Sequence, residues 1–450
     1  MNFGNGQYQA WQKICCEKIT PAMVIQMVEE SGLCGRGGAG FPTAKKWRLL
    51  AAAPGQQKFI ICNGDEGDPG AFMDRAIMEQ CPHTLLEAMR IAGYATGANM
   101  GVIYVRAEYP DAVANLQSAI NQARQLGYLG KDFDIIIRLG AGAFVCGEET
   151  ALLNSIMGLR GEPHPRPPYP TEKGLYEQPT MINNVETFAN VPNIILCGPE
   201  HFKNTKIFAV SGAVQKSGLI EVPLGTTIAQ VVYDYCGGAK PGHIIKAVQI
   251  GGPSGGCIPA DLFDTPLDYE SIKKVGAILG SGGLVVLDET TCMVNFAQFF
   301  LQFSADESCG KCTPCRVGTK KLEAILEKII KGQGCLEDLD QIRFLAQQIM
   351  DTSLCGLGQS SPTPVLTALK YFKAEFESHL RGECPAGVCF QQYKITSQCV
   401  GCGLCARQCP VHAISGELRS QHYIDSQVCV KCGLCEKSCP VHAITGGRQR

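Results

Sequence analysis

Short apolar runs that end in glycine-rich or acidic loops dominate the first part of this 450-residue chain. The runs at 58–62 and 133–139 have the pattern of buried strands, and each opens into a polar loop. The segments at 23–30 and after Gly147 have helical patterns. Because alternating strands, glycine loops and helices are typical of α/β domains, the sequence predicts such a domain, with ligands gathered at the strand ends.

The second half of the chain has a different pattern. Apolar residues recur at helical spacing over 317–331, 336–350 and 365–380, which predicts a small helical bundle. The chain is 45% hydrophobic and 18% charged, so it has enough apolar material for real cores. At about 150 residues per domain, its length indicates roughly three domains.

Charge and hydropathy exclude several classes of function. Forty Lys and Arg residues against 42 Asp and Glu residues give a net charge of −2, which disfavours a general binder of nucleic acid or anionic membranes. No run of about 18 apolar residues occurs, so we expect no direct membrane insertion. The polar start at 1–12 lacks a signal-peptide pattern, and we expect a cytoplasmic location.

A cysteine repeat near the C-terminus is the strongest chemical signal among the 25 cysteines. The segments CVGCGLCARQCPVHAI (399–414) and CVKCGLCEKSCPVHAI (429–444) carry the same spacing. In such runs three cysteines bind one [4Fe–4S] cluster and the fourth binds the other cluster. The predicted ligand sets are Cys399, Cys402, Cys405 and Cys439 for one cluster, and Cys429, Cys432, Cys435 and Cys409 for the second. A pair of zinc sites is the alternative, and the proline after each fourth cysteine disfavours it.

A third cluster is indicated by ESCGKCTPCR. Cys309, Cys312 and Cys315 surround a proline and cannot share one face of a regular helix, so a loop around a metal is expected. Three close thiolates with one distant partner favour [4Fe–4S] over zinc. The distant ligand is either Cys355, in a glycine-rich turn, or Cys335, in a connector between helical stretches, and the turn favours Cys355.

A separate metal motif follows the helical stretches. His379, Cys384 and Cys389 stand at five-residue intervals, and this donor set suits Zn²⁺ if a fourth ligand comes from elsewhere. Cys292 is a weak candidate for that ligand. The alternative is a pair of ordinary thiols in a linker.

The glycine-rich segment GRGGAG (35–40) matches a dinucleotide-binding fingerprint in letters only, because no strand precedes it. Three polar loops support a nucleotide site: NGDEGDPG (63–70), GEET (147–150) and NNVET (183–187). Glycines admit a flat ring or a phosphate against bare backbone, while Asn and carboxylates can bond hydroxyls and ring nitrogens. The alternative is that these loops only connect elements. Taken singly, Phe41 and Tyr169 are interpreted as core residues.

Several segments together resemble a known family. GRGGAGFPTAKKW, NGDEGDPG, GAGAFVCGEETALLNS, INNVETFANV and ESCGKCTPCR…SLCGLGQ are similar, in order, to the flavin-binding NADH-oxidising subunit of respiratory complex I. The CPAGVC segment and the ferredoxin tail look most like the beta subunit (HydB type) of electron-bifurcating [FeFe]-hydrogenases and related NAD-dependent formate dehydrogenase complexes. The resemblance covers nearly the whole chain. It implies FMN, NAD(H), three [4Fe–4S] clusters and one Zn²⁺ as cofactors.

The resemblance also implies a division into five units. These are an FMN- and NAD-binding α/β domain (1–204), a β-grasp-like domain of SLBB type (205–290), a helical bundle carrying one cluster (291–381), a linker with the zinc motif (382–394) and a two-cluster ferredoxin-like domain (395–450).

The same resemblance assigns residues to each cofactor. Around FMN it implies Gly35, Gly37, Lys46, Asn63, Asp65, Glu66, Gly147, Glu148, Asn183, Asn184 and Thr187. Near NAD(H) it implies Phe41, Lys46, Asp68, Glu149 and Tyr169, with Phe41 and Tyr169 on either side of the adenine. It assigns Cys309, Cys312, Cys315 and Cys355 to the cluster next to the flavin, and His379, Cys384, Cys389 and Cys292 to zinc. No side chain is expected to act as a catalytic acid or base, because the hydride chemistry belongs to the flavin.

Three positions depart from the complex I pattern. Phe144 stands where that subunit has Tyr, Asp68 replaces Glu, and Leu49 replaces a Phe that stacks on adenine. The last two changes bear on nicotinamide affinity and on any preference for NAD over NADP.

The implied function is NAD(H) oxidation or reduction within a soluble multi-subunit oxidoreductase, where FMN converts a hydride into single electrons for the clusters. A ferredoxin tail on an NADH-oxidising body indicates coupling of NAD(H) with ferredoxin and a third couple by electron bifurcation. The expected partners are a small [2Fe–2S] subunit of the complex I type, a catalytic subunit such as a hydrogenase or formate dehydrogenase, and ferredoxin. The alternatives are a peripheral NADH dehydrogenase subunit of a respiratory or Rnf-type membrane complex, and a non-enzymatic electron-transfer module.

Overall fold

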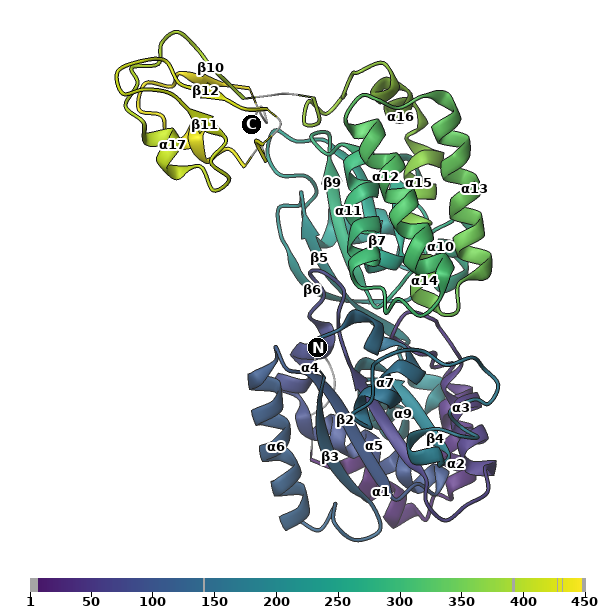
Figure 1. Ribbon diagram of the computed structural model, residues 1–450. Helices are drawn as coiled ribbons and strands as arrows, with labels where there is room; N and C mark the ends of the chain where they lie inside the picture. Colours follow the sequence, from purple (N-terminus) through teal and green to yellow (C-terminus); the bar gives the residue numbers. More distant parts are fainter. Residues whose placement is uncertain (1–6, 141, 391–392, 427, 431, 447–450) are drawn as a thin grey trace.

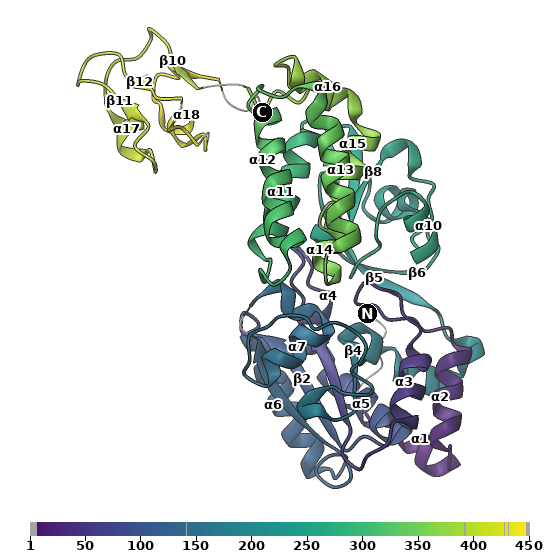
Figure 2. The ribbon, with the colours of Figure 1, turned by 45° about the vertical axis from the view of Figure 1, so that its right-hand side comes forward.

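The computed structural model describes residues 7–140, 142–390, 393–426, 428–430 and 432–446. Ala141, within one of the glycine loops, lies outside these ranges. An α/β domain lies at one end of the molecule, a mixed sheet and a helical bundle lie next to it, and a small C-terminal unit lies apart in both views (Figures 1 and 2).

The α/β domain contains a four-stranded parallel sheet with the order β3-β2-β1-β4. Its strands are β1 (Phe59–Gly64), β2 (Met100–Arg106), β3 (Asp134–Gly140) and β4 (Thr180–Asn184). Its helices and short turns are α1 (Gln9–Glu17), α2 (Pro21–Glu30), α3 (Thr43–Ala52), α4 (Met73–Gln80), α5 (Pro82–Thr96), α6 (Pro110–Gln125), η1 (Phe144–Gly147), α7 (Glu149–Ile156), η2 (Leu175–Glu177), α8 (Val185–Ala189), α9 (Val191–Cys197) and η3 (Pro199–His201). The strands predicted at 58–62 and 133–139 are thus β1 and β3, and the predicted helices are α2 and α7.

Both faces of this sheet are buried. Successive residues of a strand point to opposite faces, and Ile60 belongs to one core while Ile61 belongs to another. The first core includes Leu86 of α5 and the second includes Leu152 of α7. Burial on both faces explains why the segment of β1, at the centre of the sheet, is a continuous apolar run.

The second domain is a five-stranded mixed sheet with the order β6-β5-β9-β7-β8. Its elements are β5 (Thr205–Gly212), β6 (Gly218–Pro223), η4 (Gln230–Tyr235), β7 (Ile245–Ile250), η5 (Gly252–Ser254), β8 (Gly256–Pro259), η6 (Ala260–Leu262), α10 (Tyr269–Lys274) and β9 (Gly283–Asp288). Val231 and Val232 of the helical segment pack against sheet residues such as Phe208 and Val248. A helix packed on a mixed sheet in this way is the β-grasp-like arrangement expected for this region.

The bundle is formed by α11 (Met293–Asp306), η7 (Pro314–Gly318), α12 (Thr319–Ile330), α13 (Leu336–Thr352), α14 (Gly356–Ser360), α15 (Thr363–Tyr371) and α16 (Lys373–Leu380). The predicted stretch 365–380 is two helices, because Phe372 leaves the helical conformation (φ −123°, ψ 34°). The apolar spacing continues across this break, so it does not reveal the change of direction. Helix α11 buries one face at helical spacing, which includes Met293, Ala297, Phe300 and Leu301, whereas Asn295, Phe299, Gln302 and Asp306 on the opposite face are exposed.

The C-terminal unit has two short helices and two small antiparallel ladders, β10 with β13 and β11 with β12. Its elements are β10 (Lys394–Ile395), α17 (Leu404–Gln408), β11 (Ile414–Ser415), β12 (Tyr423–Ile424), α18 (Leu434–Ser438) and β13 (Ile444–Thr445). Each helix follows a glycine with positive φ, Gly403 or Gly433, as expected for two copies of one sequence repeat. Among all helices in the described ranges, none is both long and apolar enough to cross a bilayer.

Candidate functional site

The carboxyl ends of β1 and β4 bring predicted site residues from three loops together. In the parallel register, Asn63 of β1 pairs with Asn184 of β4, and Cys62 pairs with Asn183. Asn63 Nδ2 donates to the carbonyl of Gly147 at 2.9 Å, and Asn183 Oδ1 accepts from Trp47 Nε1 at 3.1 Å. The amides of this region are therefore held in fixed positions at one edge of the sheet.

The glycine loop at 35–40 lies against the same edge. The backbone amide of Arg36 donates to Thr187 Oγ1 at 2.8 Å, and the amide of Gly35 donates to the carbonyl of Phe41 at 2.8 Å. A Cβ atom on Gly37 would lie 3.2 Å from the Cβ of Asn184. The loop is thus closed on itself and packed tightly on the start of α8.

Asp65, directly after β1, has no hydrogen-bond partner for either carboxylate oxygen among the described residues, and both oxygens are buried. Burial raises its pKa to about 7; nearby Arg106 opposes this shift, whereas Glu108 and Glu307 add to it. A buried acid without partners inside a cluster of polar loops is what a binding site for hydroxyls or ring nitrogens requires.

Glu66 and Asp68, from the same loop, are already engaged. Glu66 accepts the backbone amides of Asp74 and Arg75 at 3.0 and 3.1 Å, at the start of α4, and burial raises its pKa to about 7. Asp68 Oδ2 accepts from Ser281 Oγ of the second domain, and burial raises its pKa to about 6. The structure therefore joins Asp68 to the β-grasp-like domain.

Glu148 and Glu149 stand at the start of α7. Glu148 accepts backbone amides of the first turn of that helix, at 2.9 and 3.0 Å, and caps it. Glu149 forms an ion pair with Lys46, which also donates to the carbonyl of Ile182 at 2.9 Å. The guanidinium of Arg166 lies 3.7 Å from Glu148 and 3.5 Å from Glu149. Sequence reasoning did not identify Arg166.

Phe41 and Tyr169 are not core residues. Their exposed fractions are 41% and 52%, which overturns the interpretation of either as core. Each ring retains surface for stacking, because no tertiary core covers it. The ammonium groups of Lys45 and Lys46 lie 5.7 Å from the Phe41 ring centroid.

The four cysteines predicted for the third cluster come together at one end of the bundle. Burial raises the pKa of Cys315 to about 11, and Cys312, Cys355 and Cys309 lie close enough to add to the shift. Cys355 is buried and is the N-cap residue directly before α14. Cys335, the disfavoured alternative, is exposed and lies beside Lys328.

The loop that carries these cysteines is attached to the α/β domain. Glu307 Oε2 accepts the backbone amide of Phe144 at 2.9 Å, and the Arg160 guanidinium donates to the carbonyl of Cys309 at 2.7 Å. Lys311 donates to the carbonyl of residue 163 at 2.8 Å. These three contacts join the η1 loop and the 160–163 segment to the cysteine loop, and sequence reasoning found none of them because they connect positions about 150 residues apart.

The C-terminal unit contains two hollows lined by the predicted crossed ligand sets. The first is lined by Cys399, Cys402, Cys405 and Cys439, and the second by Cys409, Cys429, Cys432 and Cys435. Each fourth cysteine therefore crosses to the hollow of the other repeat, as the spacing predicts.

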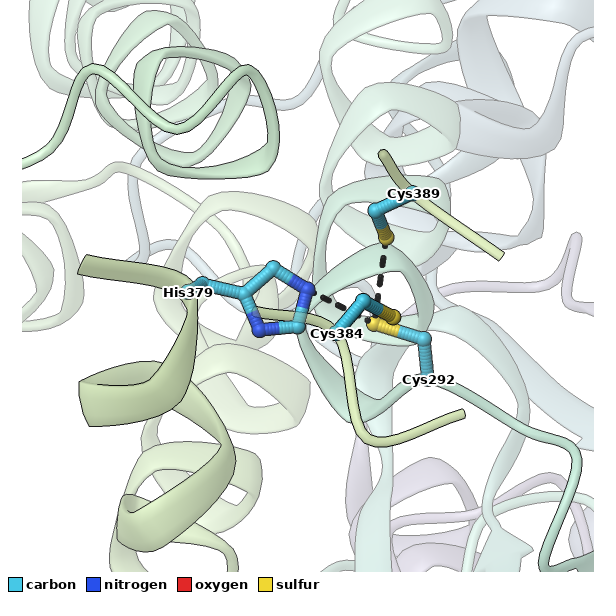
Figure 3. Close-up of side chains that lie close together, drawn as sticks. All are labelled: Cys292, His379, Cys384 and Cys389. Carbon is cyan, nitrogen blue, oxygen red and sulfur yellow. Dashed lines mark hydrogen bonds between the residues drawn. The ribbon is translucent and has the colours of Figure 1, made fainter. Parts of the chain in front are cut away.

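Ligand atoms of Cys292, His379, Cys384 and Cys389 all lie within 4.8 Å of one another (Figure 3). Cys292 Sγ lies 3.3 Å from His379 Nε2 and 3.4 Å from Cys389 Sγ, and these two hydrogen bonds lower the pKa of Cys292 to about 4. His379 Nδ1 contacts the carbonyl of Glu375 at 2.7 Å, which leaves Nε2 to face the three cysteines of this candidate metal site. The weak sequence candidate Cys292 thus joins the motif from 87 residues away.

Comparison with known proteins identifies the family. Residues 28–193 match the Nuo51 FMN-binding domain, 207–258 an SLBB domain, 295–379 the iron–sulfur binding region of NADH-ubiquinone oxidoreductase-F, and 398–443 a 4Fe–4S dicluster domain. The NADP-reducing hydrogenase subunit HndC of Solidesulfovibrio fructosivorans is 51% identical over 423 residues, covering 90% of this chain and 86% of that protein. The chain belongs to the family of flavin-binding, NADH-oxidising subunits of the complex I type.

Other members of this complex I-type family support the assignment. An F-type subunit of NADH-quinone oxidoreductase in Rhizobium meliloti is 42% identical and covers 84% of this chain and 94% of that protein. A crystal structure of an NAD⁺-reducing [NiFe]-hydrogenase in the H₂-reduced state superposes with a TM-score of 0.75 at 37% identity over 81% of this chain. The chain spans 63% of the length of that hydrogenase chain.

The residues present fit the flavin of the complex I-type family. Asp65 offers two buried oxygens without a partner among the described residues, and the asparagines Asn63, Asn183 and Asn184 are held beside the glycine loop at the same edge of the sheet. The protein is thus an oxidoreductase subunit with flavin and iron–sulfur centres, of a hydrogenase or complex I-type enzyme.

Proposed function

We propose that this chain is the NAD(H)-converting subunit of an electron-bifurcating oxidoreductase, which couples NAD(H) with ferredoxin and a third redox couple. Bound FMN exchanges a hydride as an electron pair and exchanges electrons with iron–sulfur clusters one at a time. The observation that carries the NAD(H)-converting role is the attachment of the cysteine loop to the flavin-side loops through Glu307, Arg160 and Lys311. The 4Fe–4S dicluster domain at 398–443 supports the coupling to ferredoxin.

The chain's own residues would bind and orient the ligands. Asp65, the three asparagines and the glycine loop would hold FMN, together with Lys46, Glu66, Glu148, Gly147 and Thr187. The exposed rings of Phe41 and Tyr169 would hold the adenine of NAD(H) between them. Asp68 and Glu149 would lie near the nicotinamide nucleotide. Asp68 is already bonded to Ser281 and Glu149 is already paired with Lys46, so each acid would act on the nucleotide through its partner.

Twelve cysteines would hold three [4Fe–4S] clusters: Cys309, Cys312, Cys315 and Cys355 beside the flavin, and the two crossed sets in the C-terminal unit. Cys292, His379, Cys384 and Cys389 would hold one Zn²⁺. Zinc suits this group because Zn–S bonds of about 2.3 Å give a tetrahedral edge of about 3.8 Å, a spacing these ligand atoms can reach.

The proposed partners are a small [2Fe–2S] subunit, a catalytic subunit of hydrogenase or formate dehydrogenase type, and ferredoxin. The C-terminal unit supports a ferredoxin partner, because it lies apart from the bundle and carries two cluster motifs (Figure 2). Cysteine-ligated clusters in a chain with this many free thiols suit a reducing compartment, so we propose a cytoplasmic location.

The first test is anaerobic isolation followed by metal, flavin and NADH measurements. We expect one FMN and about twelve irons per chain, at four per cluster, and bleaching of the flavin by NADH or NADPH. In Cys355→Ser we expect the loss of about four irons, whereas the exposed Cys335→Ser should keep them all. Flavin that no nicotinamide nucleotide bleaches would favour an electron-transfer module over an enzyme.

The second test concerns bifurcation. The purified complex should reduce NAD⁺ with the donor of its catalytic subunit only when oxidised ferredoxin is present as a second acceptor, because bifurcation sends the two electrons of each donor pair to different acceptors. NAD⁺ reduction by that donor at the same rate without ferredoxin would contradict the bifurcation proposal while leaving the NADH dehydrogenase assignment intact.

A further inference from the structure

We infer that the β-grasp-like domain forms a wall of the flavin site, with Tyr269 and Lys206 as positioning residues for the glycine loop at 35–40. This inference rests on the proposed binding of FMN by that loop. In Figure 1 the strands β5 and β6 of this domain lie next to the α/β domain. The contacts between the two converge on the glycine loop and on the acidic loop after β1.

Tyr269, the first residue of α10, holds the two ends of the glycine loop. Its hydroxyl donates to the carbonyl of Gly35 at 2.8 Å, across 234 positions of sequence. Its ring lies against Gly40, where a Cβ atom would come within 2.8 Å of the ring atoms Cγ and Cδ1. Gly40 also has a φ of +63°, so both the backbone conformation and the neighbouring ring require glycine there.

The middle of the loop meets the same domain. Gly38 forms an isolated antiparallel bridge with Gly280, and a Cβ atom on Gly38 would lie 3.3 Å from the Cα of Gly280. At both Gly38 and Gly40 a positive φ and the approach of the second domain therefore favour glycine.

Lys206, buried between the two domains, holds a second carbonyl of the glycine loop, that of Arg36. Its fully buried ammonium donates to the carbonyl of Arg36 at 3.2 Å and to the carbonyl of Ser281, and it pairs with Glu186 at 3.1 Å. Ser281 Oγ in turn donates to Asp68. One segment of the second domain thus holds both the glycine loop and the acidic loop.

The consequence concerns binding affinity. Asn63 and Asn184 come from the α/β domain, whereas the carbonyls of Gly35 and Arg36 are held by the β-grasp-like domain. A glycine-rich loop that was free in solution would have to be ordered when the cofactor binds, and preorganisation removes that cost. Residues of the second domain should therefore control FMN affinity by acting through the loop.

The test is Tyr269→Phe in the full chain, which keeps the ring and removes the bond to Gly35. The matched control is Tyr235→Phe, an exposed tyrosine of the same domain. Deflavinated protein is titrated with FMN under anaerobic conditions and quenching of flavin fluorescence is measured. Loss of one hydrogen bond should weaken FMN binding about two- to tenfold in Tyr269→Phe, with no change in Tyr235→Phe.

Excess FMN should restore the maximal rate of NADH oxidation in Tyr269→Phe, with an unchanged KM for NADH. FMN affinity equal to wild type, whether or not the melting temperature falls, would overturn the inference. Wild-type protein that binds no FMN would instead overturn the proposed function, so the two failures are distinguishable.

Discussion

Replacement of Cys292 by serine is the sharpest test of the candidate metal cluster formed by Cys292, His379, Cys384 and Cys389. Cys292 connects His379 with Cys389, since His379 Nε2 and Cys389 Sγ each form a hydrogen bond with the sulfur of Cys292. It also caps α11 by accepting the amide of Asn295 at 3.5 Å. Serine is a good helix cap but a poor zinc ligand, so Cys292→Ser should keep the helix while removing one metal ligand.

The expected loss of affinity follows from typical structural zinc sites. Their binding free energies of about 10–16 kcal/mol, divided among four ligands, give about 2.5–4 kcal/mol per ligand. At about 1.4 kcal/mol per factor of ten, the variant should bind zinc roughly 60- to 700-fold more weakly.

The assay is the zinc content of anaerobically purified protein, measured by elemental mass spectrometry before and after incubation with a zinc-selective chelator. Wild type should retain one zinc per chain, and Cys292→Ser should lose it to the chelator. Cys257→Ser is the control, because Cys257 is buried in the same core but contacts Thr367 instead of the cluster. A Cys292→Ser protein that retains zinc as firmly as wild type, or a wild type without zinc, would refute the reasoning.

Three further predictions concern the flavin side of the molecule. Gly40→Ala should lower the melting temperature and the FMN occupancy more than Gly32→Ala. The two glycines have nearly the same φ, +63° and +66°, but a Cβ atom on Gly40 would meet the ring of Tyr269, whereas Gly32 has no neighbour within 4 Å. Equal effects of the two substitutions would show that backbone strain alone matters. Lys206→Met should destabilise the flavin-free protein by about 3–5 kcal/mol in thermal unfolding, because it leaves the buried carboxylate of Glu186 without its cation, and a variant as stable as wild type would contradict this. Asp65 has a folded-state pKa of about 7 against an unfolded value of about 4, so its contribution to stability is full below about pH 4 and is lost as pH rises through about 7. In the flavin-free protein Asp65→Asn should therefore flatten the fall in melting temperature between about pH 4 and 7, and an unchanged slope would contradict the assignment.

Much of the chemistry follows from short segments of sequence. Iron–sulfur ligation depends on cysteines a few residues apart, so the repeat at 399–444 and the ESCGKCTPCR segment indicate clusters without any knowledge of the fold. The strand β1 was also predictable, because a strand buried on both faces is a local apolar run. The edge strand β3 carries a similar run of isoleucines, although Arg138 and Leu139 near its end are exposed. The parallel pairing of β1 with β4, which the sequence did not predict, brings Asn63 beside Asn183 and Asn184 at one edge of the sheet.

Contacts between domains had no such local signal. Cys292 reaches His379 across 87 residues, and Tyr269 reaches Gly35 across 234. A glycine looks the same in sequence whether it makes room for a cofactor or for a neighbouring domain, and the exposure of Phe41 and Tyr169 depends on what packs over them. Where a few neighbouring residues complete a site, their spacing in the sequence is enough to indicate its chemistry. The packing of distant elements decides which groups are buried, paired or exposed.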